Sequence, residues 1–369
     1  MTKIKILYLV STLKKSGPVN ILYGIVKNLD KHRFEITIVS LSKENETSMK
    51  KQFETVEARL ISLNNSRLEG VFKNKELIQK MIDADGFDIV HSHGYRADLI
   101  NRDLKNVSRF TTIHNFPEED YLLQFGKIKG SIMAQNHKKA ISQIDNRIAC
   151  SAYIKNKFAS HYNIKSHCIQ NGIDISSFEK TDSISKTELK ESLGLPLGKK
   201  IFLVCGSLIT RKDPETIIKS ILQMDQGKNC LVLTGEGKLE NRLKSRYGGE
   251  SIIFKGMVKN VSDFLYASDF FVSASTSEGL PNAVLEAMYI GIPVILSDIP
   301  SHKEIVGDQY PFLFKIKNIS ALEEKMTAMA KGLQKSSRKY HSDRVKEHFT
   351  AKIMALKYTK KYLDNVKVQ

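Results

Sequence analysis

The sequence has few cysteines, and they form no recognisable pattern. The four residues stand singly in or beside stretches that we expect to be strands: Cys150, Cys168, Cys205 and Cys230. No two of them have the short spacing of a zinc site. We therefore interpret them as small buried apolar side chains of a protein in a reducing compartment.

Long hydrophobic runs are also absent. No apolar run approaches the ~18 residues that a membrane-spanning helix needs. The first apolar run, residues 4–10, is too short for the core of a signal peptide and lacks a small-residue cleavage site, so we interpret it as a first strand. The sequence predicts a cytoplasmic protein, or one that binds peripherally to the cytoplasmic face of a membrane.

Acidic residues are outnumbered by basic ones. The chain has 57 Lys and Arg residues against 40 Asp and Glu residues, which gives a formal net charge of +17. Such a charge indicates an anionic partner, and the candidates are nucleic acid, membrane phospholipid and a phosphate-bearing substrate. The chain has no RNA-binding signature and no stacking aromatic residues interleaved with the basic ones, so we do not expect nucleic acid.

Strand-like and helix-like patterns alternate along the chain, which is typical of α/β proteins with helices on both faces of parallel sheets. A length of 369 residues favours about two domains. The expected strands are 4–10, 35–40, 89–92, 110–113, 147–150, 167–170, 201–205, 229–233, 251–254, 269–274 and 294–296. A turn signal at residues 171–174 and the polar sequence after it place a linker near 171–185. We predict two Rossmann-like domains that face a cleft, residues 1–172 and 173–350, and a C-terminal helical segment, residues 351–369.

Residues 277–288 carry the strongest functional signal. They read Ser-Glu-Gly-Leu-Pro-Asn-Ala-Val-Leu-Glu-Ala-Met, so that Glu278 and Glu286 stand eight positions apart. An apolar strand-like run precedes them, and Gly-Leu-Pro-Asn is typical of a loop that closes onto a helix start. Ligands of open α/β sheets bind at the carboxyl ends of strands, where a carboxylate suits the 2′,3′-hydroxyls of a ribose. The alternative is a solvent-facing Glu278 and a Glu286 on a helix surface.

This segment resembles the E-x7-E signature of retaining glycosyltransferases of the GT-B fold, and its surroundings are most similar to family 4 of these enzymes. The resemblance implies that Glu286 holds the ribose of a nucleotide-sugar and that Glu278 contacts the donor sugar. It also implies that the final helix crosses back to pack on the first domain. The donor would be a UDP-linked sugar, and no cofactor or metal would be needed.

Two segments of the first half fit the resemblance in part. Residues 14–20 follow the first strand where the family carries a glycine loop near the donor phosphate; Gly17 is present, whereas Ser16 replaces the first glycine and Pro18 removes one N–H donor. The alternative is an ordinary strand–helix turn. Thr-Ile-His-Asn at 112–115 resembles the segment whose histidine touches the donor sugar, so His114 joins Glu278 as a predicted catalytic residue.

Two other histidines, His91 and His93, also lie at a predicted strand end, and they fit satisfied structural histidines equally well. No carboxylate or further histidine is spaced to complete a metal site with them.

The second half supplies the remaining candidates. Residues 205–214 resemble in part the family's segment Gly-Arg-Leu-x-x-x-Lys-Gly. Lys212 matches the lysine of this segment, Ser207 stands in place of its arginine, and Arg211 adds a neighbouring cation. Gly17, Arg211 and Lys212 are therefore predicted to bind the donor diphosphate. Weaker resemblances assign a donor loop or base contact to Gly206, Gly235, Met257, Val258, Gly279 and Leu280.

These observations predict a hexosyltransferase that moves a sugar from a nucleotide-diphosphate sugar to an acceptor hydroxyl with retention, in cell-surface polysaccharide or glycolipid synthesis. A second interpretation is a catalytically weak nucleotide-sugar-binding or regulatory protein of the same fold. The missing glycine and the missing arginine favour it, whereas the presence of Glu278, His114, Arg211 and Lys212 argues against it. The acceptor stays open among lipid-linked sugars, polymers and small molecules.

One stretch of the first half is strongly basic. Between residues 121 and 165 the only acid is Asp145, and the basic residues are Lys127, Lys129, Lys138, Lys139, Arg147, Lys155, Lys157 and Lys165. Among them lie the apolar residues Tyr121, Leu122, Leu123, Phe125, Ile128, Ile132 and Met133, several of which can share one helix face. We predict that this segment docks on an anionic membrane surface that holds a lipid-linked acceptor. The alternative is a solvated basic face whose apolar stripe packs on the sheet.

Overall fold

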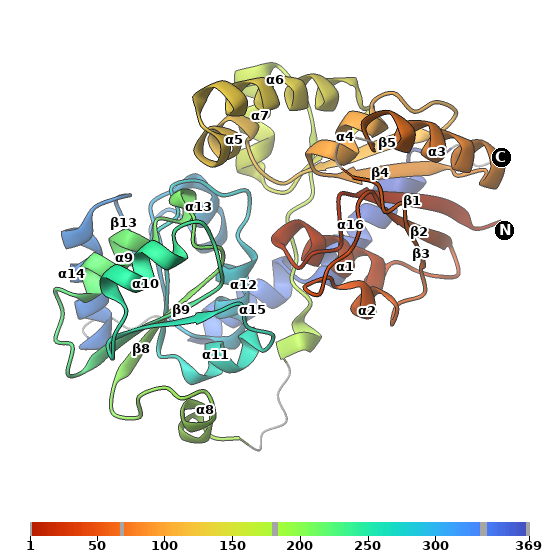
Figure 1. The fold of residues 1–369 in the computed structure, drawn as a ribbon. Helices are drawn as coiled ribbons and strands as arrows, with labels where there is room; N and C mark the ends of the chain where they lie inside the picture. The colour runs from red at the N-terminus through yellow and green to blue at the C-terminus, as the bar shows by residue number, and fades with distance from the viewer. Residues whose placement is uncertain (1, 67–69, 179–183, 333–337, 367–369) are drawn as a thin grey trace. The chain divides into compact units, whose positions relative to one another are not determined.

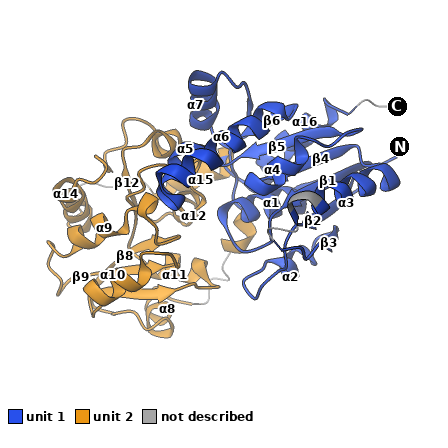
Figure 2. Cartoon of the chain, turned by 45° about the horizontal axis from the view of Figure 1, so that its top comes forward, with its two compact units in different colours: residues 1–173, 349–369 blue, residues 174–348 orange. Residues whose placement is uncertain are grey.

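The computed structural model describes residues 2–66, 70–178, 184–332 and 338–366 (Figure 1). The chain divides into two compact units: unit 1 contains residues 1–173 and 349–369, and unit 2 contains residues 174–348 (Figure 2). The sequence-based boundaries fall after residues 172 and 350. Part of the predicted linker, residues 179–183, and the last three residues of the predicted C-terminal segment lie outside the described residues.

Unit 1 is built on a parallel sheet with the strand order β3-β2-β1-β4-β5-β6-β7. Its strands are β1 (Ile4–Val10), β2 (Phe34–Ser40), β3 (Arg59–Ser62), β4 (Ile89–His93), β5 (Ser108–Ile113), β6 (Asn146–Ala149) and β7 (His167–Cys168). Its helices are α1 (Gly17–Asn28), α2 (Lys50–Phe53), α3 (Gly70–Asp85), α4 (Tyr95–Asn101), α5 (Pro117–Phe125), α6 (Lys127–Gln143), α7 (Ala152–Tyr162) and α16 (Ala351–Leu363).

Strand β1 shows why the sheet of unit 1 is covered on both faces. All residues of its apolar run from Ile6 to Val10 are buried, and successive side chains point to opposite faces. Ile6 and Tyr8 pack in the cluster formed with α1 and α16, whereas Leu7 and Leu9 pack in the cluster formed with α3 and α4. A continuous apolar run of this kind is typical of a central parallel strand.

The C-terminal helix α16 packs beside α1, at the other end of the sequence (Figure 1). The chain enters this helix next to the end of the N-terminal segment: Ile173 donates a backbone hydrogen bond to Phe349 and accepts one from Ala351, both at 2.8 Å. Gly172 lies so close that a Cβ atom there would sit 2.2 Å from the carbonyl oxygen of Thr350. The predicted return of the final helix to the first domain is confirmed.

Unit 2 is a second parallel sheet, with the strand order β10-β9-β8-β11-β12-β13. Its strands are β8 (Lys200–Cys205), β9 (Asn229–Thr234), β10 (Ile252–Gly256), β11 (Phe270–Ser273), β12 (Val294–Ser297) and β13 (Leu313–Phe314). Its helices are η1 (Ile175–Phe178), α8 (Lys186–Ser192), η2 (Thr210–Lys212), α9 (Pro214–Ile221), α10 (Glu240–Tyr247), α11 (Val261–Ala267), α12 (Asn282–Ile290), α13 (Pro300–Val306), α14 (Ile319–Ala330) and α15 (Arg338–His348), where η denotes a 3-10 turn.

Each sheet reverses its strand order at one point, between β1 and β4 in unit 1 and between β8 and β11 in unit 2. This is the Rossmann arrangement, in which ligands bind outside the carboxyl ends of the strands at the reversal. The predicted α/β class with two Rossmann-like halves is therefore confirmed. Cys150 and Cys230 are buried as predicted, while Cys168 and Cys205 are half-buried.

Candidate active site

The loops that follow β8 and β11 meet at the strand-order reversal of unit 2. The loop after β8 ends in the turn η2, where Asp213 adopts a positive φ of 45° before Pro214 starts α9. The backbone nitrogen of Thr276, in the loop after β11, donates a hydrogen bond of 2.8 Å to the carbonyl oxygen of Arg211. The two loops are thereby joined at the place where this fold binds ligands.

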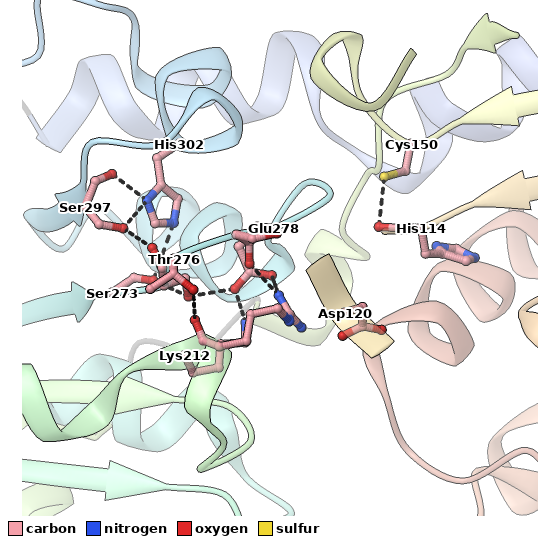
Figure 3. Close-up of polar contacts among 12 residues, drawn as sticks. His114, Asp120, Cys150, Lys212, Ser273, Thr276, Glu278, Ser297 and His302 are labelled. Carbon is pink, nitrogen blue, oxygen red and sulfur yellow. Dashed lines mark hydrogen bonds and ion pairs between the residues drawn. The ribbon is translucent and has the colours of Figure 1, made fainter. Parts of the chain in front are cut away.

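Arg211, Lys212 and Glu278 form one charge cluster at this junction (Figure 3). Nη1 of Arg211 lies 2.7 Å from one oxygen of Glu278 and 2.6 Å from the carbonyl oxygen of Ser277. Nζ of Lys212 contacts the other oxygen of Glu278. The side chain of Glu278 is only 6% exposed, so the alternative of a solvent-facing Glu278 is wrong.

The electrostatics of the cluster keep Glu278 ionised. Burial by itself would raise the pKa of the Glu278 carboxyl, but the charges of Arg211 and Lys212 and the hydrogen bonds from Lys212 and Ser275 hold this pKa well below its usual range. The cluster therefore contains one buried negative charge and two positive charges, which leaves one net positive charge for an anionic ligand.

A chain of hydroxyl groups and one histidine supports Glu278 from within the unit. Ser275 donates a hydrogen bond of 2.7 Å to Glu278, and its hydroxyl lies 3.3 Å from that of Ser273. Ser273 contacts Nε2 of His302 at 3.4 Å, and Nδ1 of His302 lies 2.8 Å from the carbonyl oxygen of Ser297 (Figure 3). Burial lowers the pKa of His302 to about 4, so this imidazole is neutral and donates to the Ser297 carbonyl.

Glu286 occupies the second turn of α12 and is half-buried. Helix α12 begins at Asn282 with Pro281 as its N-cap, so Gly-Leu-Pro-Asn is the loop that closes onto the start of this helix. The carboxylate lies near Cys205 at the end of β8: burial, assisted by the negative charge of Glu286, raises the pKa of the Cys205 thiol to about 12.

Gly206 and Gly235, which weaker resemblances assign to a donor loop, allow two loop backbones to pack closely. Gly235, with a φ of 121°, lies against Gly206, and a Cβ atom on Gly235 would sit 2.1 Å from the Gly206 carbonyl oxygen. Any larger residue at 235 would push the loops after β8 and β9 apart. The same end of the sheet has a pocket whose lining includes Cys205, Gly206, Lys212, Ser275 and Pro281.

The other residues assigned to a donor loop or base contact lie in two separate loops of unit 2. Gly279 and Leu280 are buried in the loop between Glu278 and α12. Met257 and Val258 follow β10, which is separated from β8 by β9. The base contact assigned to Met257 and Val258 stays a prediction.

In unit 1, the corresponding positions are the loops after β1, β4 and β5. Gly17 is the first residue of α1, is exposed, and has open space where a Cβ would lie. Nothing in its surroundings requires a glycine, so the phosphate contact predicted for Gly17 stays a prediction.

A row of histidines runs along β4 and β5. Nδ1 of His91 lies 2.6 Å from the hydroxyl of Tyr362 on α16, and its Nε2 lies 2.9 Å from the hydroxyl of Thr112. His91 is therefore the satisfied structural histidine that one interpretation of the sequence offered. Nδ1 of His93 lies 3.0 Å from Nε2 of His114, while the other ring nitrogen of His93 is buried and has no hydrogen-bond partner among the described residues.

His114 follows directly after β5 and is half-buried. Its carbonyl oxygen accepts a hydrogen bond of 3.4 Å from the thiol of Cys150 (Figure 3). Burial lowers the pKa of His114 to about 4, so its ring is neutral at pH 7. Because His93 is joined to one ring nitrogen, the other nitrogen of His114 is the one that can meet a substrate hydroxyl.

Sequence reasoning missed the supporting residues. The run Ser-Ala-Ser-Thr-Ser at 273–277 places hydroxyl groups at the end of β11, and this is a signal that could have been used, since polar residues at the carboxyl end of a buried strand are typical of a ligand site. His302 carries no local signal, because it reaches Ser273 only through the packing of α13. Among the described residues, no group of three or more metal-ligating side chains is assembled; whether a metal is needed stays a prediction.

Each of the two units is built on a parallel sheet with Rossmann strand order, and unit 2 has a charge cluster where its strand order reverses. This is the GT-B architecture of nucleotide-sugar glycosyltransferases. Comparison with known families agrees: residues 15–177 match the model of Glycosyltransferase Family 4, and residues 185–345 match that of Glycosyl transferases group 1. The chain belongs to this glycosyltransferase family.

Relatives and solved structures resemble the chain over most of its length. It is 29% identical over 368 residues to the O-antigen biosynthesis glycosyltransferase WclY of Escherichia coli, covering 97% of this chain and 98% of WclY. It is 27% identical to the UDP-Gal:alpha-D-GlcNAc-diphosphoundecaprenol alpha-1,3-galactosyltransferase of Escherichia coli, covering 66% of each chain. HepE of Anabaena, solved in complex with UDP and glucose, shares the fold with a TM-score of 0.81 and 15% identity, covering 98% of this chain and all of HepE.

Proposed function

We propose that this glycosyltransferase moves a hexose from a UDP-linked donor to a hydroxyl of a lipid-linked acceptor, with retention of the anomeric configuration, in the synthesis of a cell-surface polysaccharide. The observation that carries the proposal is the contact of Arg211 and Lys212 with Glu278 at the β8–β11 junction, with Glu286 on the helix that follows. The relative named for a UDP-galactose donor and a diphosphoundecaprenol acceptor supports the choice of substrates, as does the neighbour solved with UDP.

In this proposal unit 2 holds the donor. The diphosphate lies against Arg211 and Lys212, the ribose hydroxyls are held by Glu286, and Glu278 contacts the sugar. In the reaction, the bond between the anomeric carbon and the diphosphate oxygen breaks, the acceptor oxygen bonds to the anomeric carbon, and the acceptor hydroxyl gives its proton to water. The departing diphosphate gains negative charge, which the two cations stabilise; such preorganised electrostatic stabilisation is often the largest contribution to a rate.

Unit 1 takes the acceptor in this proposal, and His114 donates a hydrogen bond to a sugar hydroxyl through the ring nitrogen that His93 does not occupy. Because the imidazole is neutral, it is suited to orient a hydroxyl and not to balance charge. No residue is proposed as a covalent nucleophile.

The donor assignment is tested by a thermal-shift screen of UDP-, GDP- and ADP-linked sugars against the purified chain. A ligand at a hundredfold excess over its Kd stabilises a protein by about 2.7 kcal/mol, so the true donor should raise the melting temperature clearly. UDP release is then measured with and without a diphosphate-linked lipid acceptor. Binding with no acceptor-dependent release would favour the alternative of a nucleotide-sugar-binding protein, and no binding to any sugar nucleotide would overturn the proposal.

The ribose contact predicts the effect of one substitution. Glu286→Gln should weaken UDP binding by about 1.5–3 kcal/mol, because hydrogen bonds to a charged group lie in this range and glutamine accepts with one oxygen only. The measurement is calorimetric titration with UDP. Glu323→Gln is the matched control, since Glu323 is also a half-buried helical carboxylate of unit 2 and lies on α14. Equal UDP affinity of the Glu286 variant and wild type would remove Glu286 from the site.

A further inference from the structure

The corner between α5 and α6 presents large apolar side chains to solvent. On α6, Ile128 is 82% exposed and Ile132, one turn later, is 58% exposed. At the end of α5, Leu123 and Phe125 are 47% and 39% exposed. A surface depression lined by residues 125–129, 132 and 133 joins Phe125, Ile128 and Ile132. Apolar side chains gathered in this way are typical of an interaction surface.

These apolar side chains are not the ones that hold α6 in the fold. The buried face of α6 consists of Gly130, Ala134, His137, Ala140 and Ile141. His137 lies 2.7 Å from a carboxylate oxygen of Asp98 on α4 and 2.8 Å from the hydroxyl of Tyr121 on α5. The alternative in which the apolar stripe packs on the sheet is therefore wrong for Ile128 and Ile132.

The glycine of this inner face brings the two helices together. A Cβ atom on Gly130 would sit 2.6 Å from the carbonyl oxygen of Tyr121, so α5 and α6 meet backbone to backbone. The sequence suggested one interfacial helix, whereas the structure has two packed helices whose connection at Gly126 carries the exposed apolar groups. The corner is thus held by the residues of its inner face, whereas the large apolar side chains of its outer face are exposed.

Lysines surround the apolar corner. Lys127 and Lys129 are exposed, and Nζ of Lys129 lies 5.4 Å from the ring centroid of Phe125. The nearest acidic residues in sequence are Glu118, Glu119 and Asp120 in the first turn of α5, at the opposite end of this helix; Glu119 is paired with Lys157, and Glu118 lies 3.3 Å from His161. Along α6 itself there is no acidic residue.

We propose that this corner, consisting of Leu123, Phe125, Ile128 and Ile132 with Lys127 and Lys129, docks unit 1 on an anionic phospholipid surface. Apolar side chains enter the boundary between head groups and acyl chains, while lysines beside them pair with the head groups. A second copy of the chain is a poor occupant, because it would place the same lysines against each other. The proposal rests on the proposed function in one respect: a lipid-linked acceptor is presented at the surface on which the enzyme docks.

The test is co-sedimentation of the full chain with vesicles of phosphatidylcholine alone or of equal parts phosphatidylcholine and phosphatidylglycerol, at low and physiological salt. We expect binding to the anionic vesicles that weakens with salt. Ile128→Glu and Ile132→Glu should each lower the partition coefficient about tenfold, the effect of withholding one apolar side chain from the bilayer. Lys127→Gln and Lys129→Gln should each lower it about fivefold on anionic vesicles and leave any binding to neutral vesicles unchanged.

Matched controls come from unit 2. Leu197 is 52% exposed, and Leu197→Glu should leave vesicle binding unchanged. Lys244→Gln and Lys331→Gln, at two exposed lysines, control for the loss of net charge. If these controls reduce binding as much as the corner variants do, the attraction is a property of the net charge and the proposed surface is wrong. Absence of binding to anionic vesicles, or a dimer in lipid-free solution that the corner variants dissociate, would also overturn it.

A second measurement separates this proposal from the proposed function. UDP release with a short-chain acceptor in detergent-free solution should be the same for the corner variants and wild type, because the corner contains no residue assigned to the donor or to catalysis. Vesicle binding without any sugar-nucleotide binding would overturn the function and support the surface. Transfer to the soluble acceptor without vesicle binding would do the reverse.

Discussion

Replacing Glu278 by glutamine should lower the rate of sugar transfer by about a hundredfold or more, while UDP binds at least as tightly as to wild type. Glutamine keeps the shape of the side chain and can accept the hydrogen bond from Ser275. It removes the negative charge that partly neutralises Arg211 and Lys212, so both cations attract a diphosphate more strongly. Transfer falls because the sugar loses its proposed contact with the carboxylate. The measurements are transfer kinetics and calorimetric titration with UDP.

Asp269→Asn is the matched control for this substitution. Asp269 lies just before β11, at the end opposite Glu278, and it is also paired with two lysines, Lys186 and Lys190. Its loss should lower stability and leave the affinity for UDP unchanged. An Asp269 variant with tighter UDP binding would mean that the gain reflects overall charge, and an active Glu278→Gln enzyme would remove Glu278 from catalysis.

Acid should destabilise unit 1 through His91. Burial lowers the pKa of His91 to about 3, from 6.5, so between these values the unfolded chain binds a proton that the folded chain does not. Stability is therefore complete above pH 6.5 and is lost as the pH falls. At about pH 5 the expected loss from this one group is about 2 kcal/mol. His302 in unit 2, with its pKa lowered to about 4 by burial, should contribute a similar loss there.

Amide hydrogen exchange in β1 and β4 measures this effect within unit 1. In wild type, the free energy of opening should fall between neutral pH and about pH 5, whereas in His91→Gln this part of the fall should disappear. The Gln variant will be less stable at neutral pH, because the contacts with Tyr362 and Thr112 change. His32→Gln, at an exposed histidine of the same unit, should keep the full pH dependence. A pH dependence that is equal in the His91 variant and in wild type would assign the acid sensitivity to other groups.

The sequence predicted the sheets well where strands are long and buried. β1 was predicted with its observed bounds, and the strands β2, β8 and β9 were predicted to within one residue. It missed β3 and β13, because one is a half-exposed edge strand and the other has only two residues, so neither produces a clear apolar pattern. Within the described residues, the predicted C-terminal helical segment is helical only as far as Leu363.

Less of the site was predictable. The residue types at 211, 212 and 278 indicated an anion site, but their direct contact was not foreseen, because it joins two loops 66 or 67 residues apart in sequence. That contact depends on β8 lying beside β11, which is a property of the sheet and not of either loop. The pairing of His93 with His114 arises in the same way from β4 and β5. The roles assigned to these residues stay predictions until the variants are measured.

The return of α16 to unit 1 sets an order for folding during synthesis. Tyr358 and Tyr362 complete the core that contains Tyr8, yet they emerge from the ribosome after all of unit 2. Unit 2 is one continuous stretch and can fold as soon as it has emerged, since domains generally fold as units. The half of the protein that is made first is therefore the last to be finished, and until then the face of its sheet that α16 covers stays open to chaperones and proteases.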